Sequence, residues 1–299
     1  MLFRWAAVLG AALFCLTACT SEAPLGSKSR PINIGLVPGQ NPKTLEVNGR
    51  HLADFLEKEI GLKFQVHVPV SFIAVVEALG TKRIDMAMMN TFGYLLAHEK
   101  HGARVRLIGL FKGTDEYYGQ IIAHVDGPKT LEQLNGKKVA FVDPASTSGH
   151  LMAIRLFKER GIKPQDVVFA GRHDTVAMMV YQKRVDAGAT YHALPDNGEP
   201  QDARKLIAPQ YPDVFKKVRI LARTGPIPND PIVFRKDFPI EIQEQVVVAL
   251  RKYVKTPEGL KALDDLYHMS DFRDATDADY ENVRKMLLEA GKSASDFIK

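Results

Sequence analysis

Short apolar runs alternate along this chain with longer stretches in which apolar residues recur at helical spacing. The short runs are typical of buried strands, and the longer pattern is typical of amphipathic helices. We predict strands at residues 32–37, 64–68, 84–89, 105–111, 120–124, 138–142, 166–170, 185–190 and 219–223. We predict helices at residues 43–60, 73–79, 94–100, 150–160, 175–182, 240–255 and 277–289. This alternation is typical of an α/β fold with largely parallel sheets.

Two segments of the chain repeat one pattern at an offset of 101 residues. Residues 75–88, VVEALGTKRIDMAM, and residues 176–189, VAMMVYQKRVDAGA, each give a helix, a Lys-Arg pair and an Asp before a strand. Chance is the alternative, because amphipathic helices followed by strands are common. We interpret the repeat as two similar lobes. Ligands bind beyond the carboxyl ends of strands in such sheets, so Asn90-Thr91 and Tyr191-His192 should face one cleft.

The N-terminus has the form of a secretory leader. Residues 1–19, MLFRWAAVLGAALFCLTAC, contain one positive charge, an apolar run and small residues before Cys19. The apolar run is too short for a permanent membrane span, so residues 1–18 are predicted to be a signal peptide. Leu16-Thr17-Ala18-Cys19 resembles the lipobox of bacterial lipoproteins, whose cysteine carries lipid; an ordinary leader with a chance cysteine is the alternative. Residues 19–30 have the small polar residues, Pro and Gly of a flexible linker. We therefore expect a periplasmic protein whose folded part is tethered to a membrane through Cys19.

Composition and charge narrow the classes of function. The chain has 299 residues, 45% hydrophobic and 25% charged, which is ordinary for a globular protein and gives room for two domains. Removing residues 1–18 removes one Arg and no acid, which leaves 39 basic and 35 acidic residues, or a net charge of +4. The basic residues are spread among acids, so nucleic acid is not an expected partner. Both cysteines, Cys15 and Cys19, precede the body, which therefore lacks a thiolate for metal binding or catalysis.

One turn carries three adjacent hydroxyls, Ser146-Thr147-Ser148. It follows the strand predicted at 138–142 and precedes a helix that should begin near Gly149. The first N–H groups of a helix lack intrahelical partners and lie at the positive end of its dipole, so this turn predicts an oxyanion site. A simple helix cap is the alternative, but one cap does not need three hydroxyls.

Two further loops have the same position after a strand. Asn90-Thr91 opens the helix predicted at 94–100, and Gly171-Arg172-His173-Asp174 opens the helix predicted at 175–182. Asp174 is a natural helix cap, and His173 is placed to donate a hydrogen bond to an oxyanion. A structural histidine is the alternative, and Arg172 either contacts the ligand or faces water.

The sequence lacks the motifs of common enzymes. It contains no G-x-S-x-G elbow, no G-x-x-x-x-G-K-[ST] loop and no H-E-x-x-H pair. A triad of Ser148, His173 and Asp174 is disfavoured, because a neighbouring His and Asp cannot easily orient each other as base and support. We expect neither an enzyme nor a bound cofactor or metal.

Three motifs of the body occur in a fixed order. They are Ser146-Thr147-Ser148-Gly149, the turn at 171–174 with Val185-Asp186-Ala187-Gly188-Ala189-Thr190 after it, and Pro226-Ile227-Pro228-Asn229-Asp230-Pro231. Together they resemble the substrate-binding proteins of phosphonate and phosphite ABC importers, over about residues 32–291. The resemblance implies a type II periplasmic binding protein with two α/β lobes, a hinge and an interlobe ligand cleft. We expect lobe 1 to comprise residues 31–122 and 224–299, and lobe 2 residues 123–223.

The resemblance also implies which residues meet the ligand. In that family the hydroxyls that match the Ser-Thr-Ser turn and the histidine that matches His173 hold the phosphoryl oxygens. The acid matching Asp230 lines the site, and matching tyrosines wall it. The expected ligand-binding residues are Ser146, Thr147, Ser148, His173, Asp230, Tyr118, Tyr94, Thr91, Asn90, Phe72 and Tyr191.

The chemistry around Asp230 bears on the ligand. A carboxylate only accepts hydrogen bonds, so beside an anion it requires a ligand proton, which P–OH offers and fully ionised sulfate lacks. A salt bridge to a lysine is the alternative role. The chain has Tyr191-His192-Ala193-Leu194 where aminoalkylphosphonate binders carry a second acid, Phe72 where the family often has a tyrosine, and Asn90-Thr91 in place of a usual Gly-Pro. These departures favour a small ligand without an amine, such as phosphite or methylphosphonate.

The resemblance implies an ABC permease as the partner of a monomeric binding protein. A sensory lipoprotein that uses the same pocket to signal to a membrane kinase is the alternative. The sequence leaves transport and sensing open.

Overall fold

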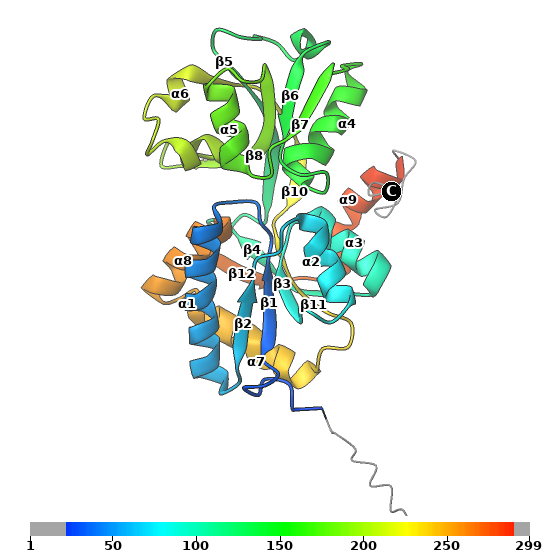
Figure 1. The fold of residues 1–299 in the computed structure, drawn as a ribbon, viewed down its shortest axis with the longest axis vertical. Coiled ribbons are helices and arrows are strands. Elements are labelled where there is room, and N and C mark those ends of the chain that lie inside the picture. The colour runs from blue at the N-terminus through cyan, green and yellow to red at the C-terminus, as the bar shows by residue number, and fades with distance from the viewer. Residues whose placement is uncertain (1–21, 290–299) are drawn as a thin grey trace, which may run out of the picture.

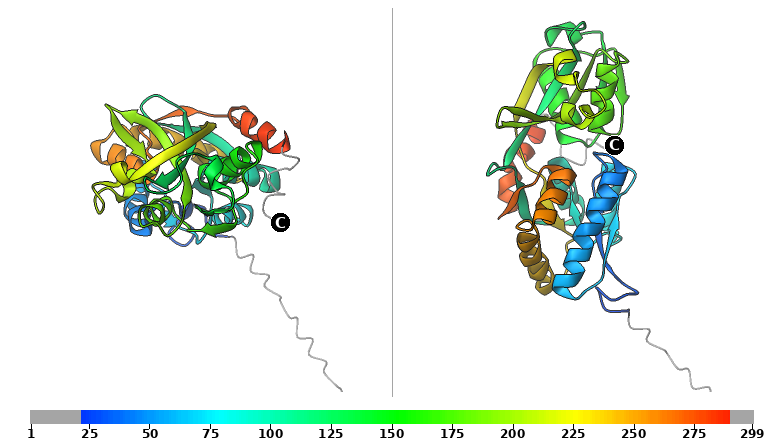
Figure 2. Two further views of the ribbon diagram at one scale, coloured as in Figure 1. Left: turned by 90° about the horizontal axis from the view of Figure 1, so that it is seen from above. Right: turned by 90° about the vertical axis from the view of Figure 1, so that its left-hand side faces the viewer.

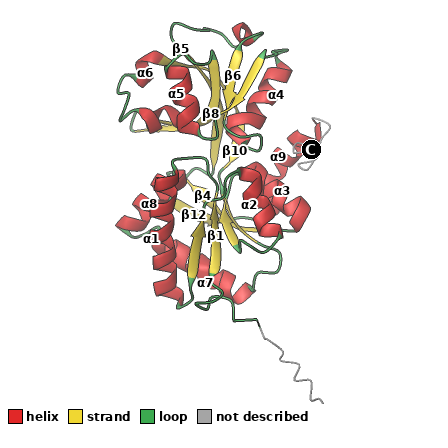
Figure 3. Ribbon diagram, viewed as in Figure 1, coloured by secondary structure: helices red, strands yellow, loops and turns green. Residues whose placement is uncertain are grey.

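A computed structural model describes residues 22–289 of the chain. It consists of two α/β lobes, each with a central sheet flanked by helices (Figure 1 and Figure 3). No helix in the described range is long and apolar enough to cross a membrane. The leader and Cys19, on which the predictions of a signal peptide and a lipid anchor depend, lie outside these residues.

Lobe 1 contains the first four strands and the C-terminal elements. Its sheet has the order β12-β4-β11-β3-β1-β2. The strands are β1 (Ile32–Leu36), β2 (Phe64–His67), β3 (Met86–Met88), β4 (Arg104–Leu110), β11 (Pro231–Phe234) and β12 (Asp271–Asp274). The helices are α1 (Pro42–Ile60), α2 (Phe72–Gly80), α3 (Thr91–His101), α7 (Ile240–Tyr253), α8 (Pro257–Tyr267) and α9 (Glu281–Glu289), with a 3-10 turn at Asp277–Tyr280 before α9.

Lobe 2 is built from the middle of the chain. Its sheet has the order β10-β5-β8-β6-β7, and β9 pairs with β8. The strands are β5 (Glu116–His124), β6 (Lys138–Phe141), β7 (Asp166–Phe169), β8 (Ala187–Asp196), β9 (Glu199–Asp202) and β10 (Val218–Pro228). The helices are a π turn at Thr147–Leu151 that continues into α4 (Met152–Glu159), α5 (His173–Tyr181) and α6 (Val214–Lys217), with 3-10 turns at Glu132–Leu134 and Ala203–Ile207.

Both sheets are mixed, which corrects the expectation of largely parallel pairing. The β1 strand pairs in parallel with β2 and β3, and β6 pairs in parallel with β7 and β8. The strands next to the crossovers, namely β4, β5, β10 and β11, pair antiparallel with their neighbours. The difference arises because the chain leaves lobe 1 and later returns to it, and each passage adds strands of reversed direction.

The repeat at an offset of 101 residues is confirmed as structural. Lys82 and Lys183, which follow the two helices, both have left-handed backbones with φ of 60° and 58°. Asp85 and Asp186 each accept a hydrogen bond from a backbone N–H of an adjoining strand, at 2.8 and 2.9 Å. The two lobes therefore use one helix-turn-strand unit, held by the same carboxylate contact.

The crossovers lie a few residues from their expected positions. Strands β5 and β10 belong to the sheet of lobe 2 along their whole length, so the chain crosses at residues 111–115 and 229–230. The expected boundaries after residues 122 and 223 fall inside these strands. The end of β10 was not predicted, because it contains Pro226 and Pro228 and proline is disfavoured within sheets.

The two lobes touch each other across their facing ends (Figure 2, right). One buried apolar cluster continues from Phe72 and Phe92 of lobe 1 to Ala145 and Leu151 of lobe 2. The backbone N–H of His173 in lobe 2 also donates to a lobe 1 carbonyl at 3.2 Å. The two lobes are therefore in direct contact in this structure.

Candidate functional site

A cavity of about 90 Å³ lies between the two lobes beside the crossovers. Carboxylates, imidazoles, hydroxyls and amides line it, but no lysine or arginine of the described residues does. An anion in this cavity would therefore meet neutral hydrogen-bond donors rather than a fixed cation. The lining residues are Val37, Gly39, Gln40, Phe72, Asn90, Phe111, Glu116, Tyr117, Ser146, Thr147, Ser148, His173, Tyr191, Ala193, Asn229, Asp230, Tyr267, His268 and Met269.

The three hydroxyls of the Ser-Thr-Ser turn lie on one wall of the cavity, and each is at most 3% exposed. Ser146 Oγ accepts a hydrogen bond from the Gly149 N–H at 3.1 Å, so Ser146 is the helix cap as well as a lining residue. A side chain at Gly149 would collide with Val142, with its Cβ 2.4 Å from Val142 Cγ2. The glycine thus allows the turn to pack against the end of the strand, which brings the first N–H groups of the helix to the cavity.

A tyrosine of strand β5 faces the same hydroxyls. It is Tyr117, which lines the cavity and whose phenol is close enough to the Ser148 and Thr147 hydroxyls to interact with them. The expectation that Tyr118 walls the cavity is corrected, because Tyr118 is not among the lining residues and its ring lies 6.4 Å from His192. Successive residues of a strand point to opposite faces. The sequence identified the pair of tyrosines but not which one faces inward.

His173 stands at the N-terminus of α5 and lines the cavity. Burial lowers its pKa to about 4, so the ring is neutral at physiological pH and has one N–H to donate. Its ring packs edge-on against Tyr191 with centroids 5.0 Å apart. Arg172 is not part of the cavity wall but pairs with Asp174 at 3.0 Å. The Asp174 carboxylate thus binds Arg172 rather than the His173 ring, which leaves no Ser-His-Asp relay.

Asp230 lies in the second crossover and lines the same cavity as the hydroxyl turn. Burial alone raises the pKa of its carboxyl to about 7. Burial, followed by the charge of Asp230, raises the pKa of the phenols of Tyr117, Tyr267 and Tyr280, which lie near it. No ion pair of Asp230 occurs within residues 22–289, so the alternative of a salt bridge to a lysine is not found there. Because the carboxyl has no partner of opposite charge, it is available to hold or accept a proton.

Besides Tyr118, two more expected residues lie outside the cavity wall, which corrects their assignment. Thr91 donates its hydroxyl proton to the carbonyl of Pro228 at 2.6 Å. Tyr94 is fully buried and donates to Asp277 Oδ1 at 2.8 Å. Both side chains therefore hold elements around the second crossover together instead of facing the cleft.

The remaining expected residues line the cavity together with several that sequence reasoning missed. Phe72, Asn90 and Tyr191 are in the wall, as predicted from their strand ends and from the resemblance. Tyr267 and His268 were missed because α8 was not predicted at all; the Tyr191 hydroxyl lies 2.8 Å from His268 Nε2. Among the described residues no cluster of His, Cys, Asp or Glu could hold a metal ion.

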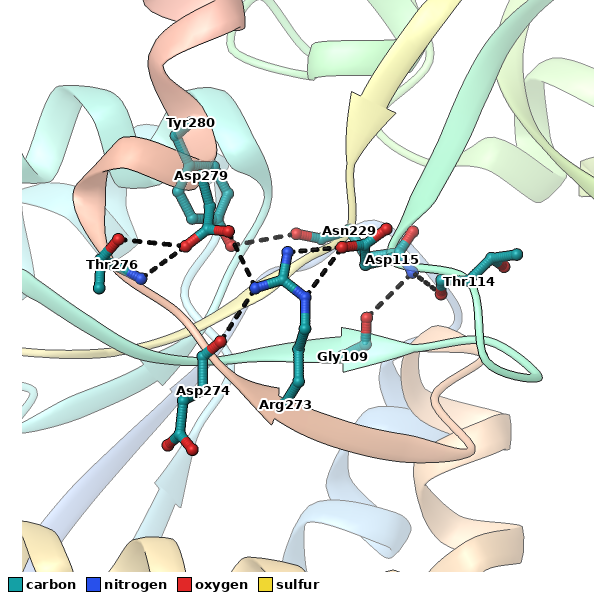
Figure 4. A network of polar contacts seen from close by, with 9 residues as sticks. All are labelled: Gly109, Thr114, Asp115, Asn229, Arg273, Asp274, Thr276, Asp279 and Tyr280. Atoms are coloured by element: carbon teal, nitrogen blue, oxygen red, sulfur yellow. Dashed lines mark hydrogen bonds and ion pairs between the residues drawn. The ribbon is translucent and has the colours of Figure 1, made fainter.

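The side chain of Asn229 ties the two crossovers together next to Asp230 (Figure 4). Its Nδ2 donates to the carbonyls of Gly109 and Thr114, both at 3.0 Å, and its backbone N–H donates to the Asp115 carbonyl at 2.7 Å. The Gly109 N–H donates to the Asp230 carbonyl at 3.1 Å. The backbone that carries Asp230 is thus fixed to the first crossover.

Arg273 of β12 anchors this pair of crossovers to lobe 1 (Figure 4). Its Nε donates to Asp115 Oδ2 at 2.8 Å, and its Nη1 lies 2.9 Å from Asp279 Oδ1. The Tyr280 hydroxyl donates to the Asn229 carbonyl at 3.3 Å. Arg273 therefore holds the acid of the cavity in place without reaching the cavity itself.

Comparison with known proteins agrees with this fold and site. The family model "ABC transporter, phosphonate, periplasmic substrate-binding protein" matches residues 34–280. The chain is 24% identical over 286 residues to the "Phosphonates-binding periplasmic protein" of Escherichia coli K12, covering 92% of this chain and 81% of the relative.

Solved structures share the fold at lower identity. One is a binding protein component of an ABC phosphonate transporter from Pseudomonas aeruginosa, with a TM-score of 0.76, 18% identity, and coverage of 89% of this chain and 87% of that one. Another is PhnD1 from Prochlorococcus marinus in complex with methylphosphonate, with a TM-score of 0.74, 17% identity, and coverage of 87% and 98%.

The fold and the interlobe cavity define a two-lobed periplasmic binding protein rather than an enzyme. More specifically, the chain belongs to the family of periplasmic substrate-binding proteins of phosphonate ABC transporters.

Loss of the Arg273 anchor should weaken ligand binding although Arg273 touches no ligand. We expect Arg273→Gln to reduce the affinity for the phosphonate that binds best in a ligand panel about two- to thirtyfold, because residues that act through others change coupling by about 0.5–2 kcal/mol. Isothermal titration calorimetry measures the effect. Arg251→Gln is the matched control, since Arg251 pairs with Asp274 of the same strand at 3.0 Å but does not contact the crossovers. Equal affinities in the two variants would contradict the prediction.

Proposed function

We propose that this protein captures a small phosphorus oxyanion carrying a P–OH group and delivers it to an ABC importer. The observation that carries the proposal is the pairing of three buried hydroxyls with an unpaired carboxyl across one cavity, with no lysine or arginine in its described wall. Ser146, Thr147, Ser148 and His173 donate to the phosphoryl oxygens. Domain closure then presents the loaded form to the permease.

The carboxyl of Asp230 selects for a ligand that shares a proton. If Asp230 is ionised, it accepts from P–OH; if it is protonated, it donates to P–O⁻. Its pKa of about 7 makes both forms accessible near neutrality. Sulfate carries no proton near neutral pH, and its oxygens are weak bases that seldom take one up. Sulfate is therefore disfavoured beside this carboxyl group.

The walls of the cavity favour a ligand without an amine. Ala193 lines it on strand β8, where a second acid would be needed to balance an ammonium group, and the volume is about 90 Å³. Glu116 of the neighbouring strand β5 also lines the cavity but is exposed to solvent, which weakens its attraction for a cation. Phosphite and methylphosphonate fit this chemistry, and methylphosphonate is the ligand of the similar Prochlorococcus structure.

A lipid on Cys19 would hold the protein at the membrane. The Leu-Thr-Ala-Cys sequence and the small polar tether after it support this part of the proposal. Several acyl chains on one cysteine give stable anchoring, whereas a single chain gives marginal binding.

A ligand panel tests the proposed function. We expect phosphite or methylphosphonate to raise the melting temperature most, since a ligand at about 100 times its Kd stabilises by about 2.7 kcal/mol, with aminoethylphosphonate and phosphate weaker and sulfate inactive. Replacing Ser146, Thr147 and Ser148 together by Ala should abolish the shift while the circular dichroism spectrum stays native. Thr81→Ala, which removes a hydroxyl that bonds only to helix carbonyls, is the control. Preference for sulfate, or no response to any phosphorus compound, would refute the proposal.

Binding should weaken in alkali. The complex retains one proton between Asp230 and the ligand, whereas at a pH well above the second pKa of the ligand and the pKa of about 7 of free Asp230 both are deprotonated. Binding must then take up a proton, so Kd should rise about tenfold per pH unit. Asp230→Asn supplies a permanent donor and should flatten the profile. Titration calorimetry from pH 7 to 9.5 measures both, and a flat profile of the native protein would exclude the shared proton.

Replacing the anchoring cysteine should release the protein. We expect Cys19→Ser to move the full-length chain from the membrane fraction to the periplasmic extract, as detected by immunoblotting. Cys15→Ser, four residues upstream in the leader, should leave it in the membrane fraction. If Cys19→Ser changes nothing, the leader is an ordinary signal peptide.

A further inference from the structure

One side chain of lobe 1 reaches across the cleft and holds a hydroxyl of the turn on lobe 2. The Nδ2 of Asn90 donates to Thr147 Oγ1 at 2.9 Å and to the Ala145 carbonyl at 2.8 Å. The backbone N–H of Phe92 donates to the same Thr147 Oγ1 at 3.0 Å. Asn90 and Thr147 both line the cavity and are 6% and 1% exposed.

These contacts determine the direction of the Thr147 hydroxyl. A hydroxyl has one proton to donate and two lone pairs that accept. Both lone pairs of Thr147 are occupied by N–H groups of lobe 1, so its proton is directed to the cavity, where it can reach only an acceptor. The phenol of Tyr117 lies there and can accept this proton until a ligand oxygen replaces it.

The orientation of the Asn90 amide follows from its second partner. The Ala145 carbonyl only accepts, so the atom facing it at 2.8 Å must be the NH₂ group. The other end, Asn90 Oδ1, is buried against helix α3 and has no hydrogen-bond partner among the described residues. A Cβ at Gly93 would lie 2.7 Å from this oxygen, so the glycine makes room for the side chain in this orientation.

Two other polar contacts join lobe 2 to the rest of the chain without involving the hydroxyl turn. The Tyr191 hydroxyl lies 2.8 Å from His268 Nε2, and Lys112 forms an ion pair with Asp196. These pairs contribute to closure but do not orient a donor toward the ligand. The Asn90 contact differs because the same hydrogen bond that joins the lobes also orients the Thr147 hydroxyl toward the ligand.

We infer that Asn90 is a specificity-determining positioning residue that, on closure, makes the Thr147 hydroxyl an obligatory donor to the ligand. This inference rests on the proposed function, because the ligand acceptor is the phosphoryl oxygen. When the lobes are apart, the Thr147 hydroxyl loses both lobe 1 donors and rotates freely, so that it can accept as well as donate. The site therefore selects for an oxyanion only when the lobes are in contact.

Three variants test the inference with methylphosphonate and phosphite as probes in titration calorimetry. Asn90→Asp is nearly isosteric but places an acceptor against the Ala145 carbonyl and draws the Thr147 proton away from the ligand. We expect affinity to fall about 100-fold, as for an unpaired charged group. Asn90→Ala should lose about tenfold. Gly93→Ala, whose Cβ would meet the Asn90 amide and Met89 but no residue of lobe 2, should lose affinity in the same direction.

Lys112→Gln is the matched control, since it removes an ion pair between the first crossover and Asp196 of lobe 2, neither residue of which lines the cavity, and it should lose less than threefold. A double-mutant cycle with Thr147→Val separates positioning from general closure. Asn90→Ala should cost at least threefold less affinity when Thr147 is already Val. Equal costs in both backgrounds, or native affinity in Asn90→Asp, would overturn the inference.

A ligand-free measurement distinguishes this failure from failure of the proposed function. If the native protein binds none of the phosphorus compounds, the proposed function is wrong. The contact itself is then judged by small-angle scattering, in which Asn90→Asp should increase the radius of gyration of the ligand-free protein and Lys112→Gln should change it less. An unchanged radius in Asn90→Asp would remove the basis for the contact in solution.

Discussion

The site has to recognise an anion with neutral donors, because the described wall of the cavity contains carboxyls but neither lysine nor arginine. Neutral donors attract an anion only when they are directed at it, since a hydroxyl that rotates freely offers lone pairs as readily as its proton. Directionality is therefore the property that the surrounding structure must supply. The cap at Ser146, the contacts of Thr147 with lobe 1 and the phenol beside Ser148 each restrict one hydroxyl.

The absence of lysine and arginine from the described cavity wall also explains the raised pKa of the Asp230 carboxyl. Asp230 has no countercharge within the described chain, and burial raises its pKa to about 7. A cavity that contained an arginine would ionise this acid fully and bind dianions without regard to their protons. In its absence, one proton is shared between protein and ligand, and the number of protons on the ligand becomes a criterion of recognition.

Rigidity at the crossovers places these groups at a defined separation. Asn229 and Arg273 fasten both crossovers to lobe 1, so Asp230 belongs mechanically to one lobe and the hydroxyl turn to the other (Figure 4). Closing the lobes then brings donor wall and acid together as two rigid bodies. Thr91 and Tyr94, which we expected in the cleft, contribute to this framework by binding Pro228 and Asp277.

The sequence by itself determined the two-lobed α/β class, the repeated helix-turn-strand unit and the strand ends that carry the hydroxyl turn and His173, whereas Asp230 was expected from the family resemblance. These features are local: periodicity, glycines that end helices and hydroxyls after a strand act within a few residues. Only the tertiary structure decided which of two neighbouring tyrosines faces the cavity, that the sheets are mixed, and that Tyr267 and His268 of the unpredicted α8 region join the wall. It also decided that Asn90 binds Thr147, 57 residues away in sequence. Strand registers and contacts between lobes depend on how distant segments pack, and no local pattern encodes that packing.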